Sequence, residues 1–223
     1  MKRLLILSLP LFLLTACLKD DEPEIIIEPV FPVLVSSDTL TTGEKWGLTI
    51  GMPAEDLYNK IKTLSFQQPV TNVQVIGNFF SKIEDLENKI SLYHAIYLDE
   101  SFGTSTGIQI AFADDKVSTI YTNSGVKLNR WPSESSLINI KTGDATEGIY
   151  QKLLRIRQFP GYSKKFERIS IFSKNLKKPY DPGMTLSRQW QFVAISDSSH
   201  TYHISVNLTD GKLNSIYYYL YKN

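Results

Sequence analysis

Side chains that could carry hydrolytic chemistry occur in two short stretches of the chain. Gly103-Thr104-Ser105-Thr106-Gly107 matches the G-x-S-x-G pattern, in which a sharp turn between a strand and a helix activates the serine. Here the five residues lie between two expected antiparallel strands. The second stretch, Ser196-Asp197-Ser198-Ser199-His200, occupies the same place later in the chain. We therefore interpret both stretches as loops.

Metal and cofactor sites are not indicated by the spacing of ligand-type residues. His200 and His203 are three residues apart, but no cysteine or third ligand stands at metal spacing beside them. Asp197 could pair with either histidine. The chain has no H-E-x-x-H motif, no phosphate-binding loop and no dinucleotide fingerprint. The sequence predicts a protein that is not an enzyme and uses no metal or cofactor, and catalysis by Ser105 or by Asp197 with His200 is the less favoured alternative.

The only cysteine, Cys17, follows a basic start and a short apolar run that are typical of an export signal. A single cysteine cannot form an internal disulfide, so the thiol needs another explanation. Leu14-Thr15-Ala16-Cys17 resembles the bacterial lipobox, which implies cleavage after residue 16 and acylation of Cys17. More than one acyl chain is enough for stable anchoring. We expect a lipid-anchored protein on the bacterial outer membrane, and an ordinary secretory signal is the alternative.

Residues 17–45 are predicted to be an acidic tether that contains prolines. The run Lys19, Asp20, Asp21 and Glu22 resembles an export signal that sends lipoproteins to the cell surface, although a solvated tether explains it equally. Prolines keep this stretch out of regular helix. Val33-Leu34-Val35 is nevertheless apolar enough to dock on the folded body, and Asp38-Thr39-Leu40 resembles an O-glycosylation site.

An internal repeat organises the remainder of the chain into residues 46–136 and residues 137–223. Gly51-Met52-Pro53-Ala54-Glu55-Asp56-Leu57-Tyr58-Asn59-Lys60-Ile61 returns as Gly143-Asp144-Ala145-Thr146-Glu147-Gly148-Ile149-Tyr150-Gln151-Lys152-Leu153. Later positions also match: Val117 corresponds to Leu213, and Tyr121 to Tyr217. Repetition of this kind predicts one structural unit built twice.

Each copy is predicted to contain one helix followed by four antiparallel strands. Helical spacing of apolar residues follows Pro53 in the first copy and the Asp144-x-x-Glu147 pair in the second, where the aspartate could cap the helix. Residues 201–208 alternate with period two, and Asp210-Gly211 favours a tight hairpin turn. The strands are expected near residues 73–80, 90–98, 106–113 and 116–122, and again near 166–172, 187–195, 201–208 and 212–221. The expected fold is α+β, with two such repeats forming one antiparallel sheet and the helices on one face.

The lipobox and the Gly-Met-x-x-Glu-Asp-Leu segment ahead of a hairpin array resemble the SmpA/OmlA outer-membrane lipoprotein family and the related beta-lactamase inhibitor protein family. The resemblance covers residues 46–222. It implies a tandem eight-stranded sheet whose open face binds a protein partner through aromatic side chains. The second copy departs from the motif at Asp144 and Gly148.

Strand alternation places a set of aromatic and polar residues on the face away from the helices: Tyr93, Tyr97, Gln109, Tyr121, His203, Tyr217, Tyr219 and Tyr221. Tyrosine offers a flat apolar ring with a polar tip, which suits protein interfaces. Strands also favour tyrosine on their own account, and the tether could cover this face. Both interpretations stay open.

Charge is distributed unevenly along the chain. Residues 137–223 contain thirteen Lys and Arg against six Asp and Glu, whereas the whole chain has a formal net charge of +1. The cluster comprises Lys152, Arg155, Arg157, Lys164, Lys165, Arg168, Lys174, Lys177 and Lys178. It could face a membrane or an acidic partner, or be a solvated surface, and nucleic acid is not expected as a partner. We expect a surface lipoprotein that binds a protein without catalysis, with an accessory subunit of an envelope assembly complex as the alternative.

Overall fold

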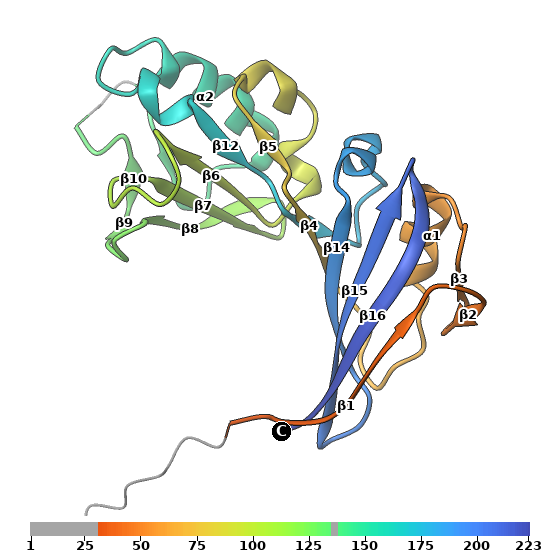
Figure 1. Cartoon of the computed structure of the whole chain (residues 1–223). Helices are drawn as coiled ribbons and strands as arrows, with labels where there is room; N and C mark the ends of the chain where they lie inside the picture. Colours follow the sequence, from red (N-terminus) through yellow and green to blue (C-terminus); the bar gives the residue numbers. More distant parts are fainter. Residues whose placement is uncertain (1–30, 135–137) are drawn as a thin grey trace, which may run out of the picture. The chain divides into compact units, whose positions relative to one another are not determined.

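The computed structural model describes residues 31–134 and 138–223, and residues 32–223 form one compact unit. This unit is a mixed α/β structure built mostly from antiparallel strands, as expected from the alternating sequence pattern (Figure 1). The described residues include two α-helices, α1 (Ala54–Ile61) and α2 (Ile149–Arg157). Five short 3-10 helices accompany them: η1 (Ile83–Leu86), η2 (Ile90–Leu92), η3 (Thr146–Gly148), η4 (Ser163–Phe166) and η5 (Pro182–Leu186).

Two six-stranded sheets make up most of the unit, in place of the single antiparallel sheet that was expected. Sheet I has, in spatial order, β1 (Val33–Leu40), β16 (Lys212–Lys222), β15 (His200–Thr209), β14 (Gln189–Ile195), β4 (Asn72–Ile76) and β13 (Ser173–Asn175). Sheet II has β5 (Phe79–Phe80), β12 (Arg168–Ser170), β6 (Ala95–Asp99), β7 (Ile108–Ala113), β8 (Lys116–Thr122) and β9 (Lys127–Leu128). Two small ribbons pair β2 (Glu44–Lys45) with β3 (Leu48–Thr49), and β10 (Arg130–Trp131) with β11 (Ile140–Lys141).

The two sheets meet along two chain segments, residues 72–80 and residues 168–175. β4 pairs with β13 in sheet I, and β5 pairs with β12 in sheet II. Between these pairs the amide of Val75 donates a 2.7 Å hydrogen bond to the carbonyl of Phe172. Each segment therefore contributes a strand to both sheets.

α1 forms where the sequence predicted a helix, with its apolar positions Leu57, Tyr58 and Ile61 buried. Pro53 is the residue before the helix rather than its first residue. The segment leading into α1 is held by the hairpin between β15 and β16, because the amide of Gly51 donates to the carbonyl of Leu213 at 2.7 Å. The start of α1 is therefore attached to the last hairpin of the chain.

α2 begins after η3 and is held in the corresponding way by the hairpin between β7 and β8. The amide of Gly143 donates to the carbonyl of Val117 at 2.8 Å. Asp144 does not cap the helix as predicted. Its carboxylate accepts from the amide of Lys141 and from the ammonium of Lys152, because the residues before the helix fold into η3.

Three segments differ from the expected elements. The apolar part of the predicted tether is the edge strand β1, paired with β16, so the folded body begins before residue 46. The strand expected at residues 90–98 begins at Ala95, because residues 90–92 form η2. Pro182 opens η5, a short helix that was not among the expected elements; proline suits a first helical position, where its missing N–H is not needed.

A β-bulge at Asn207 and Leu208 shifts the register of the long hairpin. Leu213 is buried and Asn214 is exposed, whereas alternation counted back from Tyr217 would place Leu213 on the open face and Asn214 on the covered face. An extra residue in one strand breaks the alternation, so residues on the two sides of the bulge follow opposite patterns of burial. Beyond the bulge, Ile216 and Tyr218 are buried as predicted.

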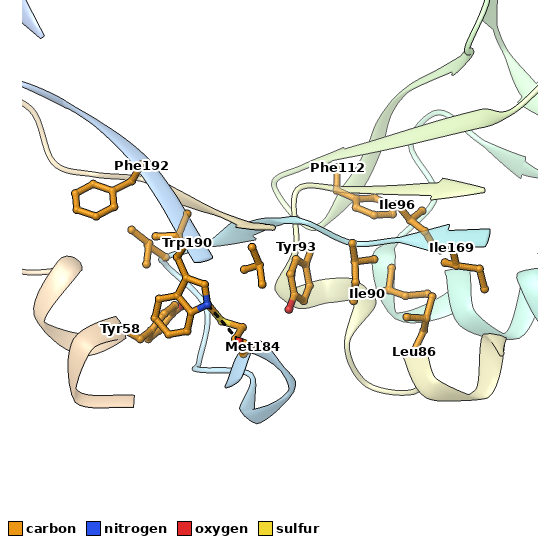
Figure 2. Packing of buried hydrophobic residues seen from close by; sticks show 14 of the residues in the cluster. Tyr58, Leu86, Ile90, Tyr93, Ile96, Phe112, Ile169, Met184, Trp190 and Phe192 are labelled. Carbon is orange, nitrogen blue, oxygen red and sulfur yellow. Dashed lines mark hydrogen bonds between the residues drawn. The ribbon is translucent and has the colours of Figure 1, made fainter. Parts of the chain in front are cut away.

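Buried apolar side chains of both sheets and both helices form one hydrophobic cluster. Trp190, which is fully buried, is fixed by a 3.2 Å hydrogen bond from its indole nitrogen to the carbonyl of Met184 in η5 (Figure 2). The opposite faces of sheets I and II carry the candidate site.

Candidate functional site

Strand register places most of the predicted aromatic residues on the open face, in separate groups on the two sheets. On sheet II, Tyr97 lies opposite Gln109, which lies opposite Tyr121. On sheet I, Tyr219 lies opposite His203. Directly opposed residues share a sheet face. Tyr217 and Tyr221 follow the same alternation on β16, and the side chains of Tyr217 and Tyr219 are 39% and 41% exposed.

Tyr93 does not belong to this face, contrary to the prediction. Its side chain is 2% exposed and lies in the core cluster, where Figure 2 shows it with Trp190 and Ile90. The hydroxyl donates a 2.7 Å hydrogen bond to the buried carboxylate of Asp181. Burial, followed by the charge of Asp181, raises the pKa of this phenol far above its ordinary value. The prediction failed because η2 replaces the first part of the expected strand, so the alternation counted from residue 90 does not apply.

A groove of about 540 Å³ on sheet II, here called the aromatic groove, lies beside Tyr97 and Gln109. Phe79 and Phe102 line it and are unusually exposed, at 50% and 84%. The guanidinium of Arg168 lies 3.8 Å from the ring centre of Phe79 and 4.9 Å from that of Phe102. No ion pair of Arg168 with an acidic residue forms within residues 31–134 and 138–223. The groove therefore combines exposed aromatic rings with a cation that is open to a partner.

The loop that carries Phe102 is fixed at its base by the carboxylate of Asp99. The amides of Glu100 and Thr104 and the side chains of Thr104 and Asn123 all donate to this carboxylate. Burial alone would raise the pKa of Asp99, but these hydrogen bonds outweigh it and hold the pKa below its ordinary value. The carboxylate is thus charged and already saturated by donors, so it positions the loop. Gln109 joins the same network by donating to Asn123 at 3.0 Å.

A second groove, of about 640 Å³, lies on sheet I and is here called the polar groove. His203, Tyr219 and Tyr221 line it, and the ring centres of His203 and Tyr221 are 5.0 Å apart. Neutral polar side chains supply most of the remaining lining: Gln68, Thr71, Asn72, Gln74, Gln191 and Ser205. None of the lining residues is Asp, Glu, Lys or Arg. Tyr217 and Tyr121 line neither groove.

Lys174, which the sequence placed in the basic cluster, is fully buried between the sheets and α1. Its ammonium donates 3.0 Å hydrogen bonds to the hydroxyl of Tyr58 and to the carbonyl of Asn175. Burial lowers the pKa of Lys174 to about 8, although the charge of Asp181 opposes this. This lysine is unavailable to a surface partner.

Four other members of the basic cluster form ion pairs with acidic residues: Lys152 with Asp144, Arg157 with Glu84, Lys165 with Glu100, and Lys178 with Asp115. Asp115, the partner of Lys178, lies in the turn between β7 and β8. Five of the nine members of the basic cluster are therefore buried or paired with an acidic residue.

The two hydrolase-like stretches fold as loops, as predicted. His200 contacts Asp197 and Ser199, at 3.0 and 3.1 Å, but both contacts use the same ring nitrogen, Nδ1. A catalytic histidine needs one nitrogen for the nucleophile and the other for the orienting acid. The amide of Ser199, followed by the ring of His200, lowers the pKa of Asp197 to about 2. The contacts therefore fit a turn and not a catalytic triad.

Within the described parts of the chain, no group of three or more metal-ligand residues comes together, and no helix is long and apolar enough to cross a membrane. Cys17, Lys19, Asp20, Asp21 and Glu22 lie outside the described residues.

Sequence reasoning missed Phe79, Phe102 and Arg168, which come from three separate segments. It also missed Gln74 and Gln191, whose period-two positions on β4 and β14 could have indicated them.

Comparison of the chain with protein-family models, with curated proteins and with solved structures finds no match.

Proposed function

We propose that this protein is a lipid-anchored surface lipoprotein that binds a protein partner through the aromatic groove and catalyses no reaction. The observation that carries the proposal is the placement of Phe79 and Phe102 beside Arg168. Large exposed apolar patches mark interaction sites, and aromatic residues and arginine dominate the energetically important positions of interfaces. A partner that offers an apolar side chain next to a carboxylate would match the groove in shape and in charge.

Membrane attachment in this proposal depends on Cys17, the only cysteine of the chain, at the end of the lipobox-like segment. The acidic run from Lys19 to Glu22 would direct the protein to the surface of the outer membrane. Intact mass should show the first sixteen residues removed and acyl chains added. Cys17→Ser should move the protein from the membrane fraction to the soluble fraction, and protease added to intact cells should degrade the wild type. A wild-type protein without acyl mass would contradict the anchor.

We further propose that the fold is a tandem duplication in which each copy holds the helix of the other. Under the repeat, Gly51 corresponds to Gly143, and Leu213 to Val117. The hydrogen bonds from Gly51 to Leu213 and from Gly143 to Val117 are thus equivalent contacts made crosswise. The isolated bridges Pro53–Lys212 and Lys116–Ala145 follow the same crosswise pattern. A duplication that exchanged its helices explains why sheets I and II both contain strands of both copies.

The partner is best sought by photo-crosslinking in the native cell. A benzophenone amino acid at Phe102 should crosslink one protein, and the same group at Phe159 should not. Phe159 is a suitable control because it is also exposed, at 38%, and lies outside both grooves. Arg168→Glu should abolish the Phe102 crosslink by repelling the partner's carboxylate.

Two outcomes of this experiment separate the alternatives. A crosslink to a single soluble or secreted protein supports the binding module. A stoichiometric crosslink to a membrane-embedded assembly supports the role of an accessory subunit. Equal crosslinking from Phe102 and Phe159 would contradict the aromatic groove as the interface.

A further inference from the structure

The polar groove on sheet I has a lining that differs in kind from that of the aromatic groove. Asn72, Gln74 and Gln191 supply amides, Ser205 supplies a hydroxyl, and Tyr219 supplies an exposed ring. No Asp, Glu, Lys or Arg lines it, and His203 is its one titratable side chain besides the tyrosines. We propose that the polar groove binds a neutral oligosaccharide. This inference does not depend on a protein partner at the aromatic groove.

Carboxamide side chains match the hydrogen-bonding needs of a sugar. Each amide has two N–H donors and one oxygen acceptor, and each sugar hydroxyl both donates and accepts. Gln74 lies directly opposite Gln191 across the β4–β14 pair, and Gln191 lies opposite Ser205 across the β14–β15 pair. The three side chains therefore form a row across the floor of the groove, perpendicular to the strands.

One acceptor in this row is unused. The amide nitrogen of Gln74 donates to the side chains of Asn72 and Ser173, at 3.3 and 3.2 Å. Its oxygen, Oε1, is shielded from solvent and has no hydrogen-bond partner within residues 31–134 and 138–223. A buried polar atom without a partner costs free energy, and turning the Gln74 carboxamide toward a ligand hydroxyl would recover it. The groove therefore favours a ligand that donates hydrogen bonds.

Aromatic rings at one end of the groove suit the apolar faces of sugar rings. Tyr219 is 41% exposed, and its ring centre is 6.5 Å from that of Tyr221. His203 lies across from Tyr219 on the neighbouring strand. The axial C–H groups of a pyranose form an apolar surface that packs on such rings, while its equatorial hydroxyls remain available to the amides. Rigid tyrosine rings give this contact area at little entropic cost.

Other ligand classes fit the groove less well. A nucleotide, a phospholipid headgroup or an acidic polysaccharide would bring charges that no lining Lys or Arg could neutralise. A fatty acid or a purely apolar ligand would leave the amides without partners. A neutral oligosaccharide satisfies the amides, needs no counter-charge and uses the tyrosine rings.

Isothermal titration calorimetry on the full chain tests the proposal, in a detergent without a sugar headgroup so that micelles do not compete. The probes are neutral hexasaccharides of β-1,4-glucose, α-1,4-glucose, β-1,4-mannose, β-1,4-xylose and β-1,4-N-acetylglucosamine, with hexagalacturonate as the charged comparison. We expect at least one neutral hexasaccharide to bind and hexagalacturonate not to bind. Tyr219→Ala and Gln191→Ala should each weaken binding by about tenfold, because each removes one principal contact.

Tyr217→Ala is the matched control. Tyr217 lies on the same strand and the same face as Tyr219, is almost equally exposed at 39%, and lies outside the groove. The control should bind the hexasaccharide as the wild type does. Failure of every neutral hexasaccharide to bind would overturn the proposal, and so would equal weakening by Tyr217→Ala and Tyr219→Ala. An intact Phe102 crosslink in Tyr219→Ala would show that the two grooves act separately.

Discussion

The hydroxyl of Tyr93 donates a 2.7 Å hydrogen bond to Asp181, and both side chains are shielded from solvent. Tyr93→Phe keeps the ring but leaves a buried carboxylate with one donor fewer. We expect the free energy of unfolding to fall by about 1–3 kcal/mol. Urea denaturation followed by circular dichroism measures this change.

Tyr97→Phe is the control for this substitution. Tyr97 is half-buried, its ring stacks on Phe172 with centres 4.7 Å apart, and no hydrogen bond of its hydroxyl occurs in the described structure. The same chemical change should therefore alter the free energy of unfolding by less than about 0.5 kcal/mol. Equal losses for both variants would show that the bond to Asp181 contributes nothing specific.

Because of Lys174, the free energy of unfolding should vary with pH in the alkaline range. Its pKa is about 8 in the folded protein and 10.5 in the unfolded chain, so between these values the unfolded chain binds more protons and stability rises with pH. Buried tyrosines oppose this above pH 10, since burial raises the pKa of Tyr58 and Tyr180 to about 12, and that of Tyr93 further, while an unfolded phenol ionises near 10. We expect the free energy of unfolding to rise by about 1 kcal/mol per pH unit between about 8 and 10, then to fall.

Lys174→Met separates this lysine from other titrating groups. The variant has no ammonium to lose, so its free energy of unfolding should be flat between about pH 8 and 10. The decline above pH 10 that the buried tyrosines cause should persist. Denaturant titrations at half-unit pH steps supply the comparison. A rise that persists in Lys174→Met would assign the pH dependence to another group.

At the scale of elements, the loop between β6 and β7 depends on close packing at Gly107. A Cβ atom there would overlap the side-chain amide of Asn123 and would lie 2.9 Å from the carboxyl carbon of Asp99. Both groups belong to the network that fixes the Phe102 loop. Gly107→Ala should therefore lower the free energy of unfolding by about 1–3 kcal/mol and loosen the loop.

Gly148→Ala provides the comparison, because nothing lies within 4 Å of a Cβ atom at that position, immediately before α2. Its free energy of unfolding should stay within about 0.5 kcal/mol of the wild type. Thermal unfolding and proteolysis of the Phe102 loop measure both effects. A Gly107→Ala protein as stable and as resistant as Gly148→Ala would remove the proposed role of the loop.

Local sequence patterns predicted the elements best where one face of a strand is buried. The hairpin of β15 and β16 was placed almost to the residue, since Ile204 and Val206 alternate with polar neighbours. Patterns failed where backbone geometry interrupts the alternation, as at η2 beside Tyr93 and at the bulge beside Leu213. His203, Tyr219 and Tyr221 followed from period two alone. The aromatic groove did not, because Phe79, Phe102 and Arg168 approach one another only through long-range strand pairing.

Pairing between strands that are distant in the sequence determines how the whole molecule is arranged. The alternation of apolar and polar residues does not reveal which strands pair. A helix with one buried face fits against either of two similar hairpins, so the alternation of apolar residues left open which hairpin would hold each helix. The structure assigns α1 to the later hairpin and α2 to the earlier one. Residues 72–80 and 168–175 then link the two sheets over one continuous core.

This linkage predicts that sheets I and II unfold as one cooperative unit. Native-state hydrogen exchange should give the slowest amides of β7, in sheet II, and of β15, in sheet I, the same free energy of opening. Ile169→Val, in the fully buried centre of β12, should lower both values equally, by about 0.5–1.5 kcal/mol. Leu186→Ala, at a residue that is 83% exposed, should leave both unchanged. Since β12 belongs to sheet II, a loss confined to the amides of β7 would mean that residues 72–80 and 168–175 do not couple the two sheets.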